Sequence, residues 1–140
     1  MEVPFGGGCA CGAIRYRCAA VPRYMGNCHC THCQQATGGA YMPVIVVKEG
    51  DFSLLQGEPS WFERPSDTGN PMSRAFCPAC GTPLFLTNGA HPGVRALYAG
   101  SLDDPSRFRP SREIYVASAQ SWNLLHPDLP RDEGMPRRSG

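Results

Sequence analysis

The spacing of the cysteines constrains this chain more than any other feature of its sequence. Seven of the eight cysteines fall in three tight groups, which are C-x-C at residues 9–11, C-x-C-x2-C at 28–33 and C-x2-C at 77–80. Neighbouring thiols in one turn can bind the same metal, and tetrahedral zinc sites combine such groups from separate parts of a chain. The fold must therefore bring distant turns together.

Composition favours metal binding over disulfides. The segment "MEVPFGGGCACGA" has no apolar core of a secretory signal, and no apolar run approaches the roughly 20 residues that span a bilayer. A net charge of +1 gives no field to attract nucleic acid or a membrane surface. We therefore expect a soluble protein of the reducing cytoplasm, where clustered cysteines hold metals or perform redox chemistry.

Four cysteines are expected to form a closed zinc site, called here the four-cysteine cluster. Its members are Cys9, Cys11, Cys77 and Cys80. In "CPACG", Pro78 restricts the turn and Gly81 can adopt a positive φ, and "CACG" carries the same trailing glycine. Such a site would be structural and would tie the N-terminal hairpin to the middle of the chain. The alternative is a disulfide pair or isolated thiols.

The remaining group is the three-cysteine cluster, Cys28, Cys30 and Cys33. Three protein ligands and one open position are typical of a catalytic zinc. The alternative is a second structural zinc, closed by His29, His32 or another residue. We interpret these histidines as orienting or solvent-facing groups rather than ligands, with a role in assisting proton transfer.

A zinc ion held by three thiolates favours thiol chemistry. The complex carries a charge of about −1, so the metal is a weaker Lewis acid than one held by neutral histidines, and it activates water less. An incoming thiol could instead bind as thiolate, remain nucleophilic and attack a carbonyl. Cys18, on the apolar face of a strand, is expected to be a core thiol. His91 and His126, in proline turns, are expected at the surface.

Short strands dominate the predicted secondary structure, because 16 glycines and 14 prolines interrupt every helical pattern. The expected strands are "AIRYRC", "MPVIVVK", "DFSLLQG", "SWFER", "MSRAFC", the stretch after "CPACG", "VRALYAGSL" and "REIYVASAQSW". The only helical turn expected is at 103–108, with Pro105 at its first position. We predict one all-β domain over residues 1–126 and a tail, 127–140, that frays or wraps the surface.

Four motifs resemble the glutathione-dependent formaldehyde-activating enzyme family, which includes centromere protein V. They are "GGCACGAIRY", "GNCHCTHCQQATGGAY", "FCPACGTPLF" and "PSREIYVASAQSW", in the family's order between Gly6 and Trp122. The resemblance implies an all-β fold of the Mss-four-like (β-tent) type with two zinc ions. It matches the four-cysteine cluster to the structural zinc and the three-cysteine cluster to the catalytic one.

The resemblance also implies a reaction, the condensation of glutathione with formaldehyde to S-(hydroxymethyl)glutathione, formally a carbon–sulfur lyase in reverse. The chain departs from the family at Gln34 and Gln35, where basic residues are common and could meet a substrate carboxylate. Trp122, with Ile114 and Val116, matches the closing strand, and we expect it in the core.

Three functions are consistent with these patterns. The first is a zinc-dependent lyase or synthase that acts on a small thiol–aldehyde adduct. The second is a non-enzymatic binding module in which both zinc sites are structural, and the fourth ligand at the three-cysteine cluster distinguishes it from the first. The third, by fold analogy alone, is a methionine-sulfoxide-reductase-like activity, which needs an accessible redox thiol at Cys18.

Overall fold

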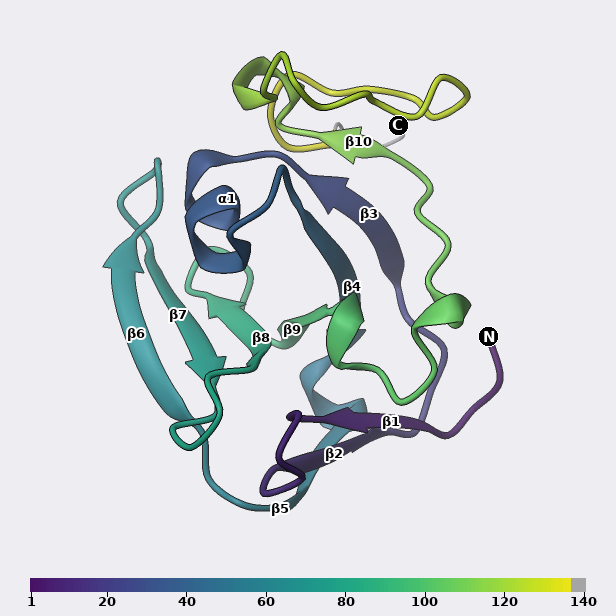
Figure 1. Ribbon diagram of the computed structural model, residues 1–140, viewed down its shortest axis with the longest axis vertical. Coiled ribbons are helices and arrows are strands. Elements are labelled where there is room, and N and C mark those ends of the chain that lie inside the picture. Colours follow the sequence, from purple (N-terminus) through teal and green to yellow (C-terminus); the bar gives the residue numbers. More distant parts are fainter. Residues whose placement is uncertain (137–140) are drawn as a thin grey trace.

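A computed structural model of the chain describes residues 1–136, and its strands form two sheets. The larger sheet has the strand order β10-β3-β4-β9-β8-β7-β6 and the smaller one β1-β2-β5, and only the β10–β3 pairing is parallel (Figure 1). The strands are β1 Phe5–Gly8, β2 Arg15–Cys18, β3 Tyr24–Cys28, β4 Met42–Lys48, β5 Phe52–Gln56, β6 Ser60–Pro65, β7 Pro71–Phe76, β8 Pro83–Asn88, β9 Val94–Tyr98 and β10 Glu113–Ile114.

Both faces of the larger sheet are buried around β4, which explains the apolar run "MPVIVVK". Ile45 and Val47 face the smaller sheet, while Met42 and Val44 face the opposite side. A strand covered on both faces is apolar at successive positions instead of alternating. The predicted strand over Met42–Lys48 is confirmed without a shift of its ends.

Two groups of buried side chains form the core, one on each face of this sheet. The group between the sheets contains Phe5, Ile14, Tyr16, Ile45, Val47, Leu84, Phe85, Leu97 and Leu102. The group on the opposite face contains Met42, Val44, Leu86, Tyr98 and Ile114 and includes Cys28 and Cys33. One of the three cysteine groups therefore lies within the second core.

One α-helix, α1 Thr31–Thr37, was not expected from the sequence. It lies against the second core group, between β4 and the β6–β7 hairpin (Figure 1). The helical turn expected at 103–108 is present as the 3-10 turn Pro105–Arg107, capped by Asp104, but the expectation of no other helix was wrong. Further 3-10 turns span Glu49–Asp51, Ala99–Ser101 and Val116–Ser118. At seven residues, α1 is too short to show a repeating apolar stripe.

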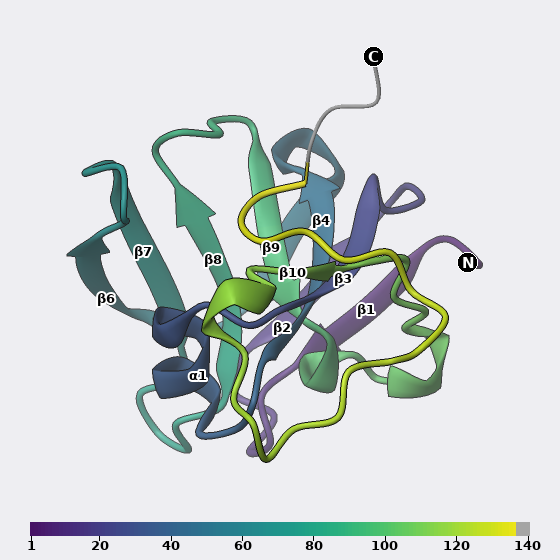
Figure 2. The same ribbon diagram turned by 90° about the horizontal axis from the view of Figure 1, so that it is seen from above.

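The described part of the C-terminal tail runs along β10 (Figure 2). The backbone N–H of Glu113 donates to Pro130, and the guanidinium of Arg112 binds both carboxylate oxygens of Asp132 at 2.6 and 3.1 Å. The last four residues of the expected tail, 137–140, lie outside the described residues. Within residues 1–136, no helix is both long and apolar enough to cross a bilayer.

The expected all-β fold is confirmed: residues 1–136 form a single domain of two sheets with one α-helix. Its loops place the cysteines in two regions. The β1–β2 and β7–β8 turns carry one group each, and the junction between β3 and α1 carries the third.

Candidate functional site

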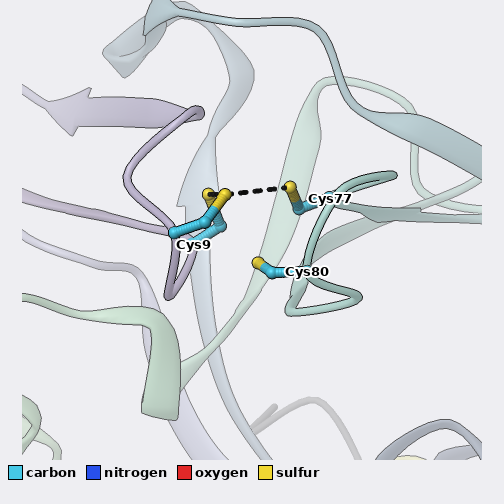
Figure 3. A group of neighbouring side chains, drawn as sticks. Cys9, Cys77 and Cys80 are labelled. Atoms are coloured by element: carbon cyan, nitrogen blue, oxygen red, sulfur yellow. Dashed lines mark hydrogen bonds between the residues drawn. The ribbon is translucent and has the colours of Figure 1, made fainter.

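The four-cysteine cluster joins the two sheets. Its sulfur atoms lie within 4.8 Å of one another, with 3.6 Å between Cys9 and Cys11 and 3.7 Å between Cys11 and Cys77. Figure 3 shows Cys9 on one turn facing Cys77 and Cys80 on the other. The predicted grouping of these four residues is therefore present in the fold.

Both turns of the four-cysteine cluster depend on a glycine. Gly12 and Gly81 follow the second cysteine of their pairs and have φ values of +80° and +78°, a region that favours glycine. The N–H of Gly81 donates to the carbonyl of Cys77 at 2.8 Å, which closes the turn. Each glycine thus lets the chain reverse so that the two sulfurs of its pair point the same way.

Hydrogen bonds favour the thiolate form at two members of this cluster, Cys80 and Cys9. The hydroxyl and N–H of Thr82 interact with Cys80 and lower the pKa of its thiol to about 5. The N–H of Ile14 donates to the sulfur of Cys9 at 3.2 Å. Because metal ligands are thiolates, such donors suit a metal site. Four convergent sulfurs from two knuckle turns fit a closed tetrahedral zinc.

The three-cysteine cluster is built from the end of β3 and the start of α1. Cys28 is the last residue of β3, Cys30 is the N-cap of α1, and Cys33 lies in its first turn. The sulfur of Cys30 accepts from the N–H of Cys33 at 3.3 Å and lies 3.0 Å from the Cys33 sulfur. The unexpected helix is therefore what brings the third sulfur back to the first two.

Within residues 1–136, no further cysteine, histidine, aspartate or glutamate completes this group with a fourth ligand atom within 4.8 Å. Mutual hydrogen bonds with Cys28 and Cys33 lower the pKa of Cys30 to about 2, and they raise the pKa of Cys28. The cluster therefore readily carries at least one thiolate, and it presents three ligands rather than four.

His29 does not face solvent and does not join the ligands, although it lies between two of them in sequence. Its side chain is fully buried at 0% exposure, and its Nε2 pairs with the carboxylate of Glu113, which also accepts from the amide of Asn27 at 2.9 Å. Its Nδ1 has no hydrogen-bond partner among the described residues. His29 thus anchors the β3–α1 junction to β10, which is an orienting role.

Arg74 is the residue next to this cluster that sequence analysis missed. It is buried at 7% exposure on β7, donates to the Tyr98 hydroxyl at 2.6 Å and has Nη2 at 3.7 Å from the sulfur of Cys33. Its other polar contacts are the sulfurs of Met42 and Met72. No carboxylate pairs with Arg74 among the described residues.

The burial of Arg74 without a carboxylate partner indicates whether the three-cysteine cluster fits a metal ion. Burying an unpaired charge is costly, so a nearby anion is required. Three thiolates around a divalent zinc carry about −1, which one arginine balances. Three neutral thiols would leave Arg74 without a counter-charge. The donor set and its surroundings therefore fit a metal bound by thiolates.

The exposure of the other residues discussed above can be compared with what the sequence led us to expect. Cys18 is fully buried, and burial raises its pKa to about 12, which excludes the accessible redox thiol that the reductase-like hypothesis requires. His91 and His126 are exposed, as expected, and His32 is half-buried. Gln34 donates to the carbonyls of His29 and Ser118, so it braces the backbone of the β3–α1 junction.

Trp122 was expected in the core and is 68% exposed, so that expectation was wrong. Ile114 is buried, but β10 ends there because Tyr115 adopts a left-handed φ of 57° and the chain turns into the 3-10 turn Val116–Ser118. An alternating strand pattern consequently does not continue to Trp122.

The residues missed by sequence analysis left weak signals. Arg74 interrupts the otherwise apolar and small residues of "MSRAFC", and Glu113 precedes a buried position in "REIYV". A lone charge in a short strand usually points to solvent. Only the three-dimensional structure shows that Arg74 is buried beside Cys33 and Glu113 beside His29.

These features define a class of protein, a small two-sheet β protein with one four-thiol and one three-thiol cluster. The chain belongs to the glutathione-dependent formaldehyde-activating enzyme family, whose model matches residues 4–118. This finding confirms the resemblance found in the sequence motifs.

A named relative and a solved structure are also similar to this chain. A protein of Halomonas elongata, provisionally named a glutathione-dependent formaldehyde-activating enzyme, is 26% identical over 121 residues, which cover 83% of this chain and 77% of that protein. The crystal structure of a Rhodobacter sphaeroides protein superposes with a TM-score of 0.58 at 17% identity, covering 70% of this chain and 87% of that one. The second likeness shows the fold alone.

Proposed function

We propose that this protein is a zinc-dependent carbon–sulfur lyase that catalyses the addition of a thiol, such as glutathione, to formaldehyde. The four-cysteine cluster would hold a structural zinc and the three-cysteine cluster a second, catalytic zinc. The observation that carries the proposal is the three-ligand cluster beside a buried cation, with no fourth protein ligand within residues 1–136. Such a site has room for an incoming sulfur.

In the proposed reaction a carbon–sulfur bond forms between the thiol and the aldehyde carbon. The C=O double bond becomes a C–OH single bond, and the proton lost by the thiol ends on that oxygen, so atoms and charge balance. A zinc ion, when bound, would supply Lewis-acid stabilisation of the substrate sulfur as thiolate. Arg74 adds a fixed positive charge at this position.

The histidines take different parts in this proposal. His32 is half-buried and lines the surface beside α1, so it can exchange protons with solvent and assist transfer to the nascent hydroxyl. His29 is buried against Glu113 and acts by holding the β3–α1 junction in place. Loss of His32 should therefore lower the catalytic rate, while loss of His29 should disturb the metal site itself.

The test compares S-(hydroxymethyl)glutathione formation with and without the zinc-loaded protein, because thiols add to formaldehyde unaided. Exchange spectroscopy by NMR at equilibrium measures both rates directly. We expect acceleration by wild type and loss of acceleration in Cys30→Ser. A fully metallated wild type that accelerates no tested thiol–aldehyde pair would refute the proposal and leave the non-enzymatic binding module as the function.

A further inference from the structure

A groove runs beside α1 and offers a binding site for the part of a substrate that does not react. Two adjoining cavities, both open to solvent and of about 580 and 370 Å³, share His32, Gln35 and Arg64 in their walls. We call them together the α1–β6 groove. Sites for small ligands have volumes of about 300–1,000 Å³, so the groove is large enough for a ligand of several residues.

The charged side chains of the groove are all basic or histidine. Arg64 and Arg74 line it from β6 and β7, and His32 lines it from α1. Neither aspartate nor glutamate occurs among the described residues that line either cavity. The groove therefore favours an anionic ligand, although the whole chain carries a net charge of only +1.

Arg64 is held in position without being neutralised. Its Nη1 donates to Oε1 of Gln35 at 2.9 Å, which ties β6 to α1, and no carboxylate pairs with it among the described residues. The remaining N–H groups of its planar fork suit a carboxylate, which they can bind through two parallel hydrogen bonds. A half-buried and oriented arginine is a better anion site than a mobile surface one.

The groove also leads toward the three-cysteine cluster. Its smaller cavity is lined by Arg74 and Tyr98, and Arg74 contacts the sulfur of Cys33. Cys33 and Gln35 are two positions apart on α1, so their side chains project to nearly opposite sides of the helix. Arg64 and Arg74 line the same cavity, so a ligand that reaches both Arg64 and the cluster must bridge a separation on the order of 10 Å, the diameter of a helix.

We propose that the α1–β6 groove recognises an extended thiol by a carboxylate far from its sulfur, with Arg64 as the residue that determines this specificity. That the sulfur of the ligand points toward the three-cysteine cluster rests on the proposed function. That its carboxylate binds at Arg64 rests on the groove alone. The exposed faces of Phe62 and Trp122 border the two cavities and offer apolar walls to the ligand between its ends. Gln34 and Gln35 on α1 carry no positive charge. Arg64 on β6 supplies it instead.

The experiment measures binding of S-methylglutathione to the zinc-loaded protein by calorimetry. This probe keeps the carboxylates of glutathione, but its sulfur is blocked, so binding does not require the reaction. We expect Arg64→Gln to weaken binding about tenfold, the value of one charge-assisted hydrogen-bond pair near a surface. The matched control is Arg17→Gln, which removes the same charge from an exposed position on β2 in the other sheet.

Two comparisons make the result decisive. The diethyl ester of the probe should bind wild type and Arg64→Gln equally weakly, because it has no carboxylate to lose. Equal binding of the acid by Arg64→Gln and Arg17→Gln, tight binding of the ester, or no binding of the acid by wild type would each overturn the proposal. Arg64→Lys should recover only part of the affinity, since lysine cannot make the bidentate contact.

The groove and the reaction can fail separately. If wild type binds the probe through Arg64 but accelerates no condensation, the anion site is supported and the proposed function is wrong. Tryptophan fluorescence gives a second measurement of binding, because the chain has two tryptophans and only Trp122 lines the groove. In a Trp61→Phe background, the emission of Trp122 should shift on addition of the acid and stay unchanged with the ester.

Discussion

At the scale of single residues, Arg74 links the charge of the three-cysteine cluster to the stability of the fold. A guanidinium removed from water needs an anion, and the nearest one available is the sulfur of Cys33. In the metal-loaded protein the thiolates supply that charge. In the metal-free protein the cluster carries fewer thiolates, so it offsets the buried charge of Arg74 less completely.

Arg74→Met should therefore destabilise the two forms by different amounts. We expect it to lower the free energy of unfolding of the zinc-loaded protein by about 3 kcal/mol, the cost of removing one partner of a buried pair. The same change should cost less when the three-cysteine cluster holds no metal, because fewer thiolates then face Arg74. Urea unfolding of both forms measures the difference. Equal losses in both would show that Arg74 contributes packing alone.

The buried thiol of Cys18 makes the stability of the fold depend on pH. Burial, and secondarily the carboxylate of Asp51, raise the pKa of Cys18 to about 12, above the ordinary thiol value of about 8.5. The folded state thus holds this proton more tightly than the unfolded state. The resulting stabilisation is complete below about pH 8.5 and is lost as the pH rises toward 12.

Cys18→Ala removes this titrating group, so comparing it with wild type separates the contribution of Cys18 from that of other groups. The free energy of unfolding of wild type should fall more steeply than that of Cys18→Ala between pH 8.5 and 11, at constant free metal. Chemical denaturation across this range provides the measurement. Parallel curves for the two proteins would mean that the thiol of Cys18 does not titrate differently on folding.

At the scale of elements, the two clusters depend on different amounts of the chain. The three-cysteine cluster lies within one junction, from the end of β3 to the first turn of α1. The four-cysteine cluster joins the β1–β2 turn of the smaller sheet to the β7–β8 turn of the larger one. Loss of a ligand should have local consequences in the first case and global ones in the second.

Paired substitutions test this difference. Cys30→Ser should lose one metal per chain and retain the β-sheet circular dichroism signal. Cys77→Ser should lose the other metal and unfold cooperatively at a much lower temperature, because metal binding at a structural zinc is worth of order 10 kcal/mol of folding energy. Metal analysis and thermal melts give both quantities. Collapse of Cys30→Ser to the same degree would make the three-cysteine cluster structural as well.

The sequence predicted the strands better than it predicted the helix. Alternation in "AIRYRC" and the apolar run in "MPVIVVK" follow directly from burial on one or two faces, and both strands are found. Helix α1 was missed because it has no apolar stripe that the sequence pattern could show. Its sequence is set instead by the spacing of the cysteines at its start and by the C-cap Gly38, which has a φ of 74°.

At the scale of the whole molecule, cysteine spacing predicted which sulfurs would meet, because few combinations of turns satisfy a tetrahedral site. The surroundings of those sulfurs could not be predicted in the same way. Arg64 reaches Gln35 from 29 residues away, and Glu113 reaches His29 from 84 residues away. Such pairs depend on strand order and on the path of the tail, which no local pattern in the sequence encodes.

The four-cysteine cluster has a consequence for how this protein responds to its surroundings. Because it connects turns 66 residues apart, a metal there acts as a reversible cross-link whose occupancy follows mass action. Each tenfold rise in free zinc above the dissociation constant should add about 1.4 kcal/mol to stability, a shift of several degrees in melting temperature. Melts in zinc buffers of stepped concentration measure this slope, and a flat response would exclude the cross-link. The supply of free zinc would then set the lifetime of the folded protein.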